Sequence, residues 1–227
     1  MAIEAVNLTK EYERRGQKFR AVNDVSFTIE KGKITAVMGR SGSGKSTLLN
    51  LLTGMISPDV GEVMIDGKEL GIMKEQEKRR LRAVRIGIIP QSQSLIGGLT
   101  VAENIRLQTD LKDGFEKQGN TRRRELYAEL IRNLGMEELL EVLPHKLSGG
   151  EMKRAAIARA LAKDPDYIFA DEPTGELDEE NVKRVMRLFR KEAERGKAVF
   201  MITHDHAAGE KADIKYQMEN GKISQLN

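Results

Sequence analysis

The sequence predicts a single-domain α/β fold, because short apolar runs of strand length alternate with amphipathic helical segments. Ile- and Val-rich runs of four or five residues have the length of strands covered on both faces, and they occupy Ile34–Met38, Ile86–Ile89 and 199–202. Val182, Val185, Met186 and Phe189 repeat at helical spacing after Asp178. At 227 residues the chain can bury about 70% of its unfolded surface, so one large domain is expected.

Two regions depart from this alternation. Residues 2–12 and 19–29 predict adjacent strands around a polar turn at 14–17, and residues 60–66 predict a third strand of a small antiparallel layer. From Ser92 onward strand signals vanish, and glycines separate helical segments. The expected organisation is one domain over 1–227, with an α/β core at 1–91 and 165–227 and an inserted helical subdomain at 92–164.

Composition excludes several function classes. With 38 basic and 35 acidic residues, six Phe, four Tyr and no Trp, the chain offers neither the charge excess nor the stacking platforms typical of nucleic-acid binding. Acidic neighbours interleave with the basic stretches 78–80 and 122–124, which favours solvated helix faces over the alternative of nucleic-acid patches. Because there is no cysteine, a disulfide scaffold, a thiolate zinc site and a cysteine nucleophile are all excluded.

The apolar runs are also too short for a membrane span, which needs about 20 residues. The first residues lack a basic region followed by an apolar stretch, so no signal peptide is expected. The sequence therefore predicts a cytoplasmic protein without direct membrane insertion.

The strongest local motif satisfies the phosphate-binding pattern G-x-x-x-x-G-K-[ST] between an apolar strand and a helix over 48–52. Glycines bring backbone N–H groups close to phosphate oxygens, and the helix N-terminus favours an anion. We expect the lysine to face the β- and γ-phosphates of ATP, and the serine that follows it to ligate Mg²⁺. The alternative is a glycine-rich turn without a ligand. The motif comprises Gly39, Arg40, Ser41, Gly42, Ser43, Gly44, Lys45, Ser46 and Thr47.

A second strand supplies the acidic partner that such a loop needs. The apolar run that begins at Tyr167 ends in Asp171 and Glu172. We expect Asp171 to hold Mg²⁺ directly or through water, and Glu172 to orient or deprotonate an attacking water. The alternative is an acidic pair that only caps a loop.

A third motif, Leu-Ser-Gly-Gly-Glu at 147–151, precedes an Ala-rich helix predicted over 152–163, and here the sequence resembles the ATP-binding cassette (ABC) ATPases. The resemblance covers residues 1 to about 220 and implies a P-loop NTPase core of the RecA-like type. It implies that Tyr12 stacks on adenine, that Gln91 reaches the γ-phosphate and Mg²⁺, that Asp178 is the D-loop aspartate and that His204 is the switch histidine.

The resemblance also implies partners. In the family, two copies pack head-to-tail, and each ATP lies between the P-loop of one copy and the signature of the other. Here the signature residues are Ser148, Gly149, Gly150 and Glu151. Serine and glycines at a helix N-terminus form an anion-binding end on physical grounds as well. Integral membrane permease subunits are the other expected partners, which places the chain peripherally on the inner face of the cell membrane.

Within the family, the sequence resembles the group of ATPases that drive lipoprotein release, efflux of macrolides or antimicrobial peptides, and the cell-division ABC complex. Pro90 and the pair Met152-Lys153 depart from the usual residues, namely an aromatic before Gln91 and Gln-Gln after the signature. Alternatives are a soluble ABC ATPase that acts on nucleic acid or ribosomes, and a binding protein without catalysis. We expect the permease to dock on residues 92–104. The flexible segment 92–99 would supply the apolar contacts, through Leu95, Ile96 and Leu99. The alternative is that these three side chains pack inside the helical subdomain.

Overall fold

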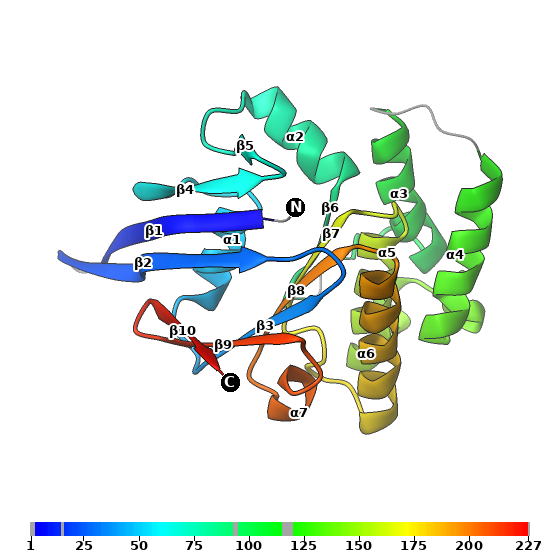
Figure 1. Cartoon of the computed structure of the whole chain (residues 1–227). Coiled ribbons are helices and arrows are strands. Elements are labelled where there is room, and N and C mark those ends of the chain that lie inside the picture. The colour runs from blue at the N-terminus through cyan, green and yellow to red at the C-terminus, as the bar shows by residue number, and fades with distance from the viewer. Residues whose placement is uncertain (1–2, 15, 93–94, 115–119, 227) are drawn as a thin grey trace.

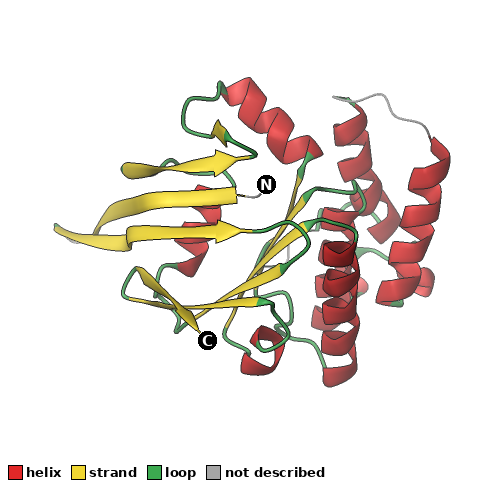
Figure 2. Cartoon of the chain, viewed as in Figure 1, coloured by secondary structure: helices red, strands yellow, loops and turns green. Residues whose placement is uncertain are grey.

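The computed structural model describes residues 3–14, 16–92, 95–114 and 120–226. Figure 1 shows an antiparallel sheet, a second, mostly parallel sheet, and a group of helices on the side away from the antiparallel sheet. Figure 2 shows the same division by secondary structure. The predicted α/β class is confirmed. Within the described residues no helix is long and apolar enough to cross a bilayer.

The antiparallel sheet has the strand order β2-β1-β4-β5. Its strands are β1 (Ile3–Arg14), β2 (Gln17–Ile29), β4 (Val60–Ile65) and β5 (Lys68–Glu69). The three strands expected from the sequence are confirmed, and β1 runs two residues farther than predicted because Arg14 still pairs with Gln17 across the turn. The same register places Tyr12 opposite Phe19.

The second sheet has the strand order β10-β9-β3-β8-β7-β6 and is parallel except for β10. Its strands are β3 (Ile34–Met38), β6 (Ile86–Ile89), β7 (Tyr167–Asp171), β8 (Ala198–Thr203), β9 (Ile214–Glu219) and β10 (Lys222–Leu226). The short apolar runs therefore form buried strands as predicted, and β8 lies between the strands that carry the phosphate loop and the acidic pair.

Helices cover both faces of this sheet, as parallel strands require. They are α1 (Lys45–Leu52), α2 (Glu75–Val84), α3 (Val101–Asp113), α4 (Asn120–Leu134), α5 (Gly149–Leu161), α6 (Glu179–Glu194) and α7 (His206–Gly209), with 3₁₀ turns at Glu137–Leu139 and Pro144–Lys146. Helix α1 packs in the core between the two sheets, whereas the apolar stripe of α6 joins the core on the opposite face. The caps explain two helix starts: Asp178 caps α6 as expected, and Ser148 starts α5 three residues earlier than predicted.

The expectation that residues 92–99 form a flexible apolar contact segment is wrong in part. Asn104 is fully buried, and its side-chain amide accepts from the N–H of Ile96 and donates to the carbonyls of Ile96, Leu99 and Thr100, which fixes this turn. Leu95 packs against the core, while Ile96 remains 45% exposed. Residues 93–94 lie outside the described residues.

A cluster of aromatic rings joins the two sheets. Phe200 on β8 is fully buried, with ring centroids 6.0 Å from Phe27 on β2 and 5.6 Å from Phe169 on β7. We predict that Phe200→Ala lowers the free energy of unfolding by about 3–5 kcal/mol, because the substitution leaves a cavity between the sheets. Denaturant unfolding measures this. Ile72→Ala, at a side chain that is 77% exposed, should change stability by less than about 0.5 kcal/mol, and equal losses in both variants would contradict this packing.

Candidate active site

One large cavity, of about 720 Å³, opens where the parallel strands end. The strand register aligns Met38 of β3 with Thr203 of β8, and Asp171 of β7 with Ile202 of β8. The residues that follow these strands therefore meet at one edge of the sheet. The cavity is lined by Tyr12, Phe19, Ala21, Arg40, Ser41, Gly42, Gly44, Lys45, Ser46, Thr47, Gln91, Asp171, Glu172 and His204.

The loop between β3 and α1 requires glycine at two positions. Gly44 has φ 108°, and a Cβ there would lie 1.9 Å from the carbonyl oxygen of Ala21 on β2. Gly39 has φ 155°, and a Cβ there would lie 2.3 Å from the carbonyl oxygen of Met218 on β9. Close approach of neighbouring backbone therefore sets the path of the loop.

Polar donors within this loop fit a polyphosphate. The buried Lys45 ammonium donates to the carbonyls of Gly39 at 2.7 Å and Arg40 at 2.9 Å. Burial lowers the pKa of Lys45, and the charges of Glu172 and Asp171 oppose this shift. The buried Ser43 hydroxyl has no hydrogen-bond partner among the described residues. A buried hydroxyl without a partner is costly, and a phosphate oxygen would satisfy it.

The Ser46 hydroxyl donates to Asp171 at 2.8 Å, which brings two oxygen ligands together across the cavity. Burial raises the pKa of Asp171, while the Ser46 hydrogen bond opposes this rise. Hard cations such as Mg²⁺ prefer oxygen ligands and are often completed by phosphate oxygens and water. The described residues contain no cluster of three or more acidic or histidine side chains that could hold a metal ion. The residues present thus fit a magnesium ion that arrives with phosphate.

Glu172 is held in place by His204. The His204 imidazole Nδ1 lies 2.8 Å from one carboxylate oxygen of Glu172, and the His204 backbone N–H donates to the other at 3.3 Å. The Glu172 side chain is 11% exposed and the His204 side chain 74% exposed, so the pair spans from the cavity wall to solvent. Glu172 also has φ 50°, a conformation that costs free energy in a non-glycine residue and often marks a functional site.

The cavity also has an aromatic end. The rings of Tyr12 and Phe19 lie 6.0 Å apart between centroids, and both side chains are partly exposed, at 37% and 47%. Phe19 was not among the predicted site residues. The predicted hairpin could have revealed it, because antiparallel pairing across a turn at 14–17 places residue 19 beside Tyr12.

The signature residues and Asp178 do not line this cavity. Ser148 and Glu151 form a capping box at the exposed start of α5, in which the Ser148 hydroxyl donates to Glu151 at 2.8 Å. A Cβ on Gly150 would contact the carbonyl oxygen of Glu176 at 3.4 Å, so the segment before Asp178 packs beside the signature. The structure thus separates the predicted site residues into two groups.

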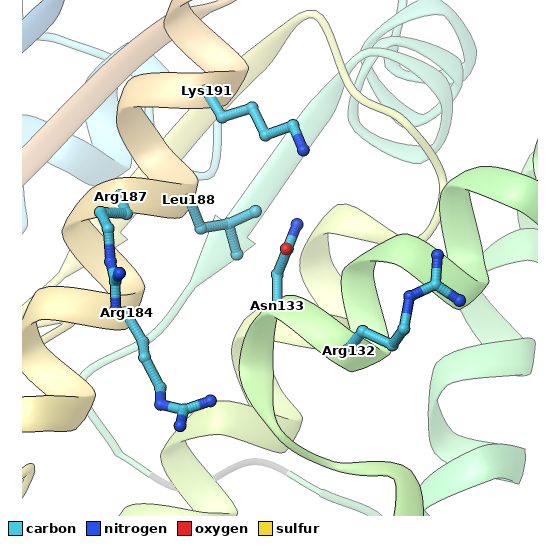
Figure 3. A pocket seen from close by; sticks show the side chains of 6 residues that line it. All are labelled: Arg132, Asn133, Arg184, Arg187, Leu188 and Lys191. Carbon is cyan, nitrogen blue, oxygen red and sulfur yellow. The ribbon is translucent and has the colours of Figure 1, made fainter.

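A second cavity, of about 400 Å³, lies between α4 and α6 and is rich in cations (Figure 3). Two of its cations are already neutralised: Arg184 pairs with Glu180, and Lys191 pairs with Glu129. It has no glycine-rich loop and no acidic pair. Its lining comprises Arg132, Asn133, Arg184, Arg187, Leu188 and Lys191. The cavity at the strand ends is therefore the better candidate for a nucleotide.

Comparisons with known proteins agree with this choice. Residues 22–175 match the family described as ABC transporter. The chain is 40% identical over 205 residues to the lipoprotein-releasing system ATP-binding protein LolD of Aquifex aeolicus, covering 90% of each chain. It is 39% identical over 210 residues to the ABC transporter ATP-binding protein YtrE of Bacillus subtilis, covering 92% of this chain and 89% of that protein.

Among solved structures, the chain resembles a dimeric post-hydrolysis state of the ATP-binding cassette MJ0796 bound to ADP and Pi. The TM-score is 0.90, with 32% sequence identity and coverage of 99% of both chains. The similarity spans both sheets and the helical segment between them.

We predict that Gly44→Ala destabilises the chain by about 2 kcal/mol more than Gly42→Ala. Both positions have positive φ, but a Cβ at Gly42 meets nothing within 4 Å, whereas the Cβ at Gly44 collides with the backbone of β2. The matched pair therefore isolates the collision from the cost of the left-handed conformation. Chemical denaturation checks it, and equal losses would show that Ala21 does not limit the loop.

Proposed function

The chain belongs to the ABC transporter family of ATP-binding cassettes, and we propose that it binds and hydrolyses ATP in the cavity at the carboxyl edge of the six-stranded sheet. One observation carries the proposal. A phosphate loop with a buried lysine, an Asp171–Ser46 pair and a Glu172–His204 pair all face the same cavity.

Lys45 and the loop residues 39–47 would bind the phosphates. The Lys45 ammonium donates to the loop carbonyls of Gly39 and Arg40, which holds it beside the backbone that would bind the β- and γ-phosphates. When bound, Mg·ATP supplies a phosphoanhydride whose charge is partly neutralised by the metal. Ser46, Asp171 and Gln91 are the proposed metal-side residues. Tyr12 would stack on adenine, and Phe19 would support its ring.

Glu172 is the proposed general base. Its carboxylate lies at the cavity wall and accepts from His204 through both the imidazole and the backbone N–H, which fixes its orientation. An acceptor fixed in this way can take a proton from a water aligned with the γ-phosphate. His204, at the end of β8, would position Glu172 and contact the γ-phosphate.

A second copy of the chain is the proposed completion of the site. Ser148, Gly149, Gly150, Glu151 and Asp178 are arranged outside the cavity that holds Lys45. The N–H groups at the start of α5 form a binding end suited to an anion. The similar cassette MJ0796 is dimeric with ADP and Pi bound. A head-to-tail dimer would place this signature on the partner's ATP.

Membrane permease subunits are the proposed partners that ATP hydrolysis by this chain drives. Relatives are named as ATP-binding proteins of a lipoprotein-releasing system and of an ABC transporter, and a role in efflux or extraction at the cytoplasmic face of the membrane follows by analogy. Ile96, exposed on the turn fixed by Asn104, remains the proposed contact from the segment 92–104.

We predict that Glu172→Gln keeps ATP binding but lowers turnover by roughly 10²–10⁴-fold, because the proton acceptor is lost. With ATP and Mg²⁺ the variant should elute as a stable dimer from a sizing column, while the wild type hydrolyses and separates. Glu210→Gln, a surface change at a glutamate that pairs with Lys215, should keep wild-type turnover. Normal turnover by Glu172→Gln would exclude Glu172 as the base.

We predict that Ser148→Arg spares ATP binding to the monomer and abolishes ATP-driven dimerisation, because it puts bulk where the partner's phosphate docks. Thr100→Arg is the matched control, since Thr100 caps α3 through the same capping box and its loss should leave dimerisation of the isolated chain intact. Calorimetry and light scattering separate the two steps. Loss of monomer binding in Ser148→Arg would place Ser148 in its own chain's site.

A further inference from the structure

Helix α5 carries a buried lysine that the nucleotide site as described does not use. Lys153 lies two residues after Glu151, the last signature residue, and is 5% exposed. Its ammonium donates to the carbonyl oxygen of Gln91 at 3.0 Å and to that of Pro90 at 3.3 Å. Lysine is almost never fully buried without partners, because burying an ammonium costs desolvation free energy. The two hydrogen bonds to carbonyls offset part of that cost.

Two of the charges that act on Lys153 belong to the active site, and a third belongs to the segment beside the signature. Glu176, Asp171 and Glu172 act electrostatically on its ammonium and favour the charged form, while burial lowers its pKa. Lys153 thus contacts the loop after β6 and is influenced electrostatically by the carboxylates at the end of β7. It is the point at which α5 meets both parts of the site.

Within the described residues, the loop after β6 receives two hydrogen bonds from this buried lysine. Pro90 has no backbone N–H to donate, and the Gln91 and Ser92 residues are exposed. The hydrogen bonds from Lys153 therefore connect the loop that carries Gln91, a proposed γ-phosphate ligand, to helix α5. The interior face of α5 consists largely of closely packed alanines. The buried alanines of α5 are Ala155, Ala156, Ala158 and Ala160.

We propose that Lys153 is a positioning residue that clamps the Gln91 loop to α5, so that Gln91 and the signature at Ser148 move as one body. This inference rests on the proposed function. Gln91 faces the ATP of its own chain, whereas Ser148 faces the ATP of the partner. Through Lys153, closure of one nucleotide site is transmitted along α5 to the other.

The chain supplies a matched control in Lys163, just beyond the C-terminal end of α5. Lys163 is also 5% exposed, and its ammonium donates to the carbonyl oxygen of Arg82 at 2.7 Å. Burial lowers the pKa of Lys163 to about 8. Lys163 does not line the nucleotide cavity. Removing either ammonium takes away a donor to backbone carbonyls, and of these two lysines Lys153 is the one that contacts the Gln91 loop.

The test compares Lys153→Met, Lys153→Gln and Lys163→Met. For Lys153→Met we expect ATP affinity of the monomer, measured by calorimetry without Mg²⁺, to stay within about threefold of wild type. Its kcat should fall at least about tenfold, the effect of losing charge-assisted hydrogen bonds. Lys153→Gln can still donate to a carbonyl and should recover most of that loss. Lys163→Met should keep wild-type kcat even where its Tm falls.

Several results would overturn the clamp. The first is a wild-type kcat in Lys153→Met. The second is a kcat in Lys153→Gln as low as that of Lys153→Met. The third is that kcat falls in both Lys153→Met and Lys163→Met in proportion to the fall in Tm. If Lys153→Met does not fold, Lys153→Ser replaces it, because a small polar side chain admits water to the two carbonyls and yet cannot fix the loop. Lys153→Ser should show the same loss of kcat. Wild-type protein without ATPase activity would refute the proposed function instead.

Discussion

The parallel register of β3, β8, β7 and β6 is the constraint on which the rest of the structure depends. Each strand in this part of the sheet is paired with its neighbour so that all four end at the same edge. The residues that follow them belong to segments far apart in sequence, from Gly39 to His204. Strand pairing brings them to one cavity, and a slip of one residue would exchange the side chains on the two covered faces of a strand and shift the residues that follow it.

A lysine and two carboxylates of opposite charge act on one another at this edge of the sheet. The charges of Glu172 and Asp171 act on Lys45, and two carbonyls of its own loop accept hydrogen bonds from its ammonium. These two hydrogen bonds hold the Lys45 ammonium beside the loop over residues 39–47. Preorganised donors of this kind cost nothing to reorient during the reaction. The left-handed conformation at Glu172 and its hydrogen bonds to His204 fix the acceptor in the same way.

The sequence was sufficient for what depends on local pattern. The strand lengths, the stripe on α6, the cap at Asp178 and the glycines of the phosphate loop follow from periodicity, capping and turn chemistry. It was insufficient where tertiary contacts decide. Nothing local shows that Asn104 fixes the turn at 96–100 or that Leu95 packs inward.

Lys153 illustrates the same limit. In the sequence it differs from the usual glutamine and has no assigned role, because its partners are backbone carbonyls 62 and 63 residues away. Phe19 is intermediate. The hairpin was predicted, and pairing across its turn places Phe19 beside Tyr12. The assignment of chemical roles to individual site residues remains a prediction that only functional measurements test.

The most direct test of the account is a crystal structure of the Glu172→Gln chain grown with ATP and Mg²⁺. The account predicts a two-fold dimer, with each ATP between residues 39–47 of one copy and Ser148 of the other, and with Mg²⁺ at Ser46. Nucleotide bound in the cationic cavity between α4 and α6, or ATP contacted by Ser148 of its own chain, would contradict it.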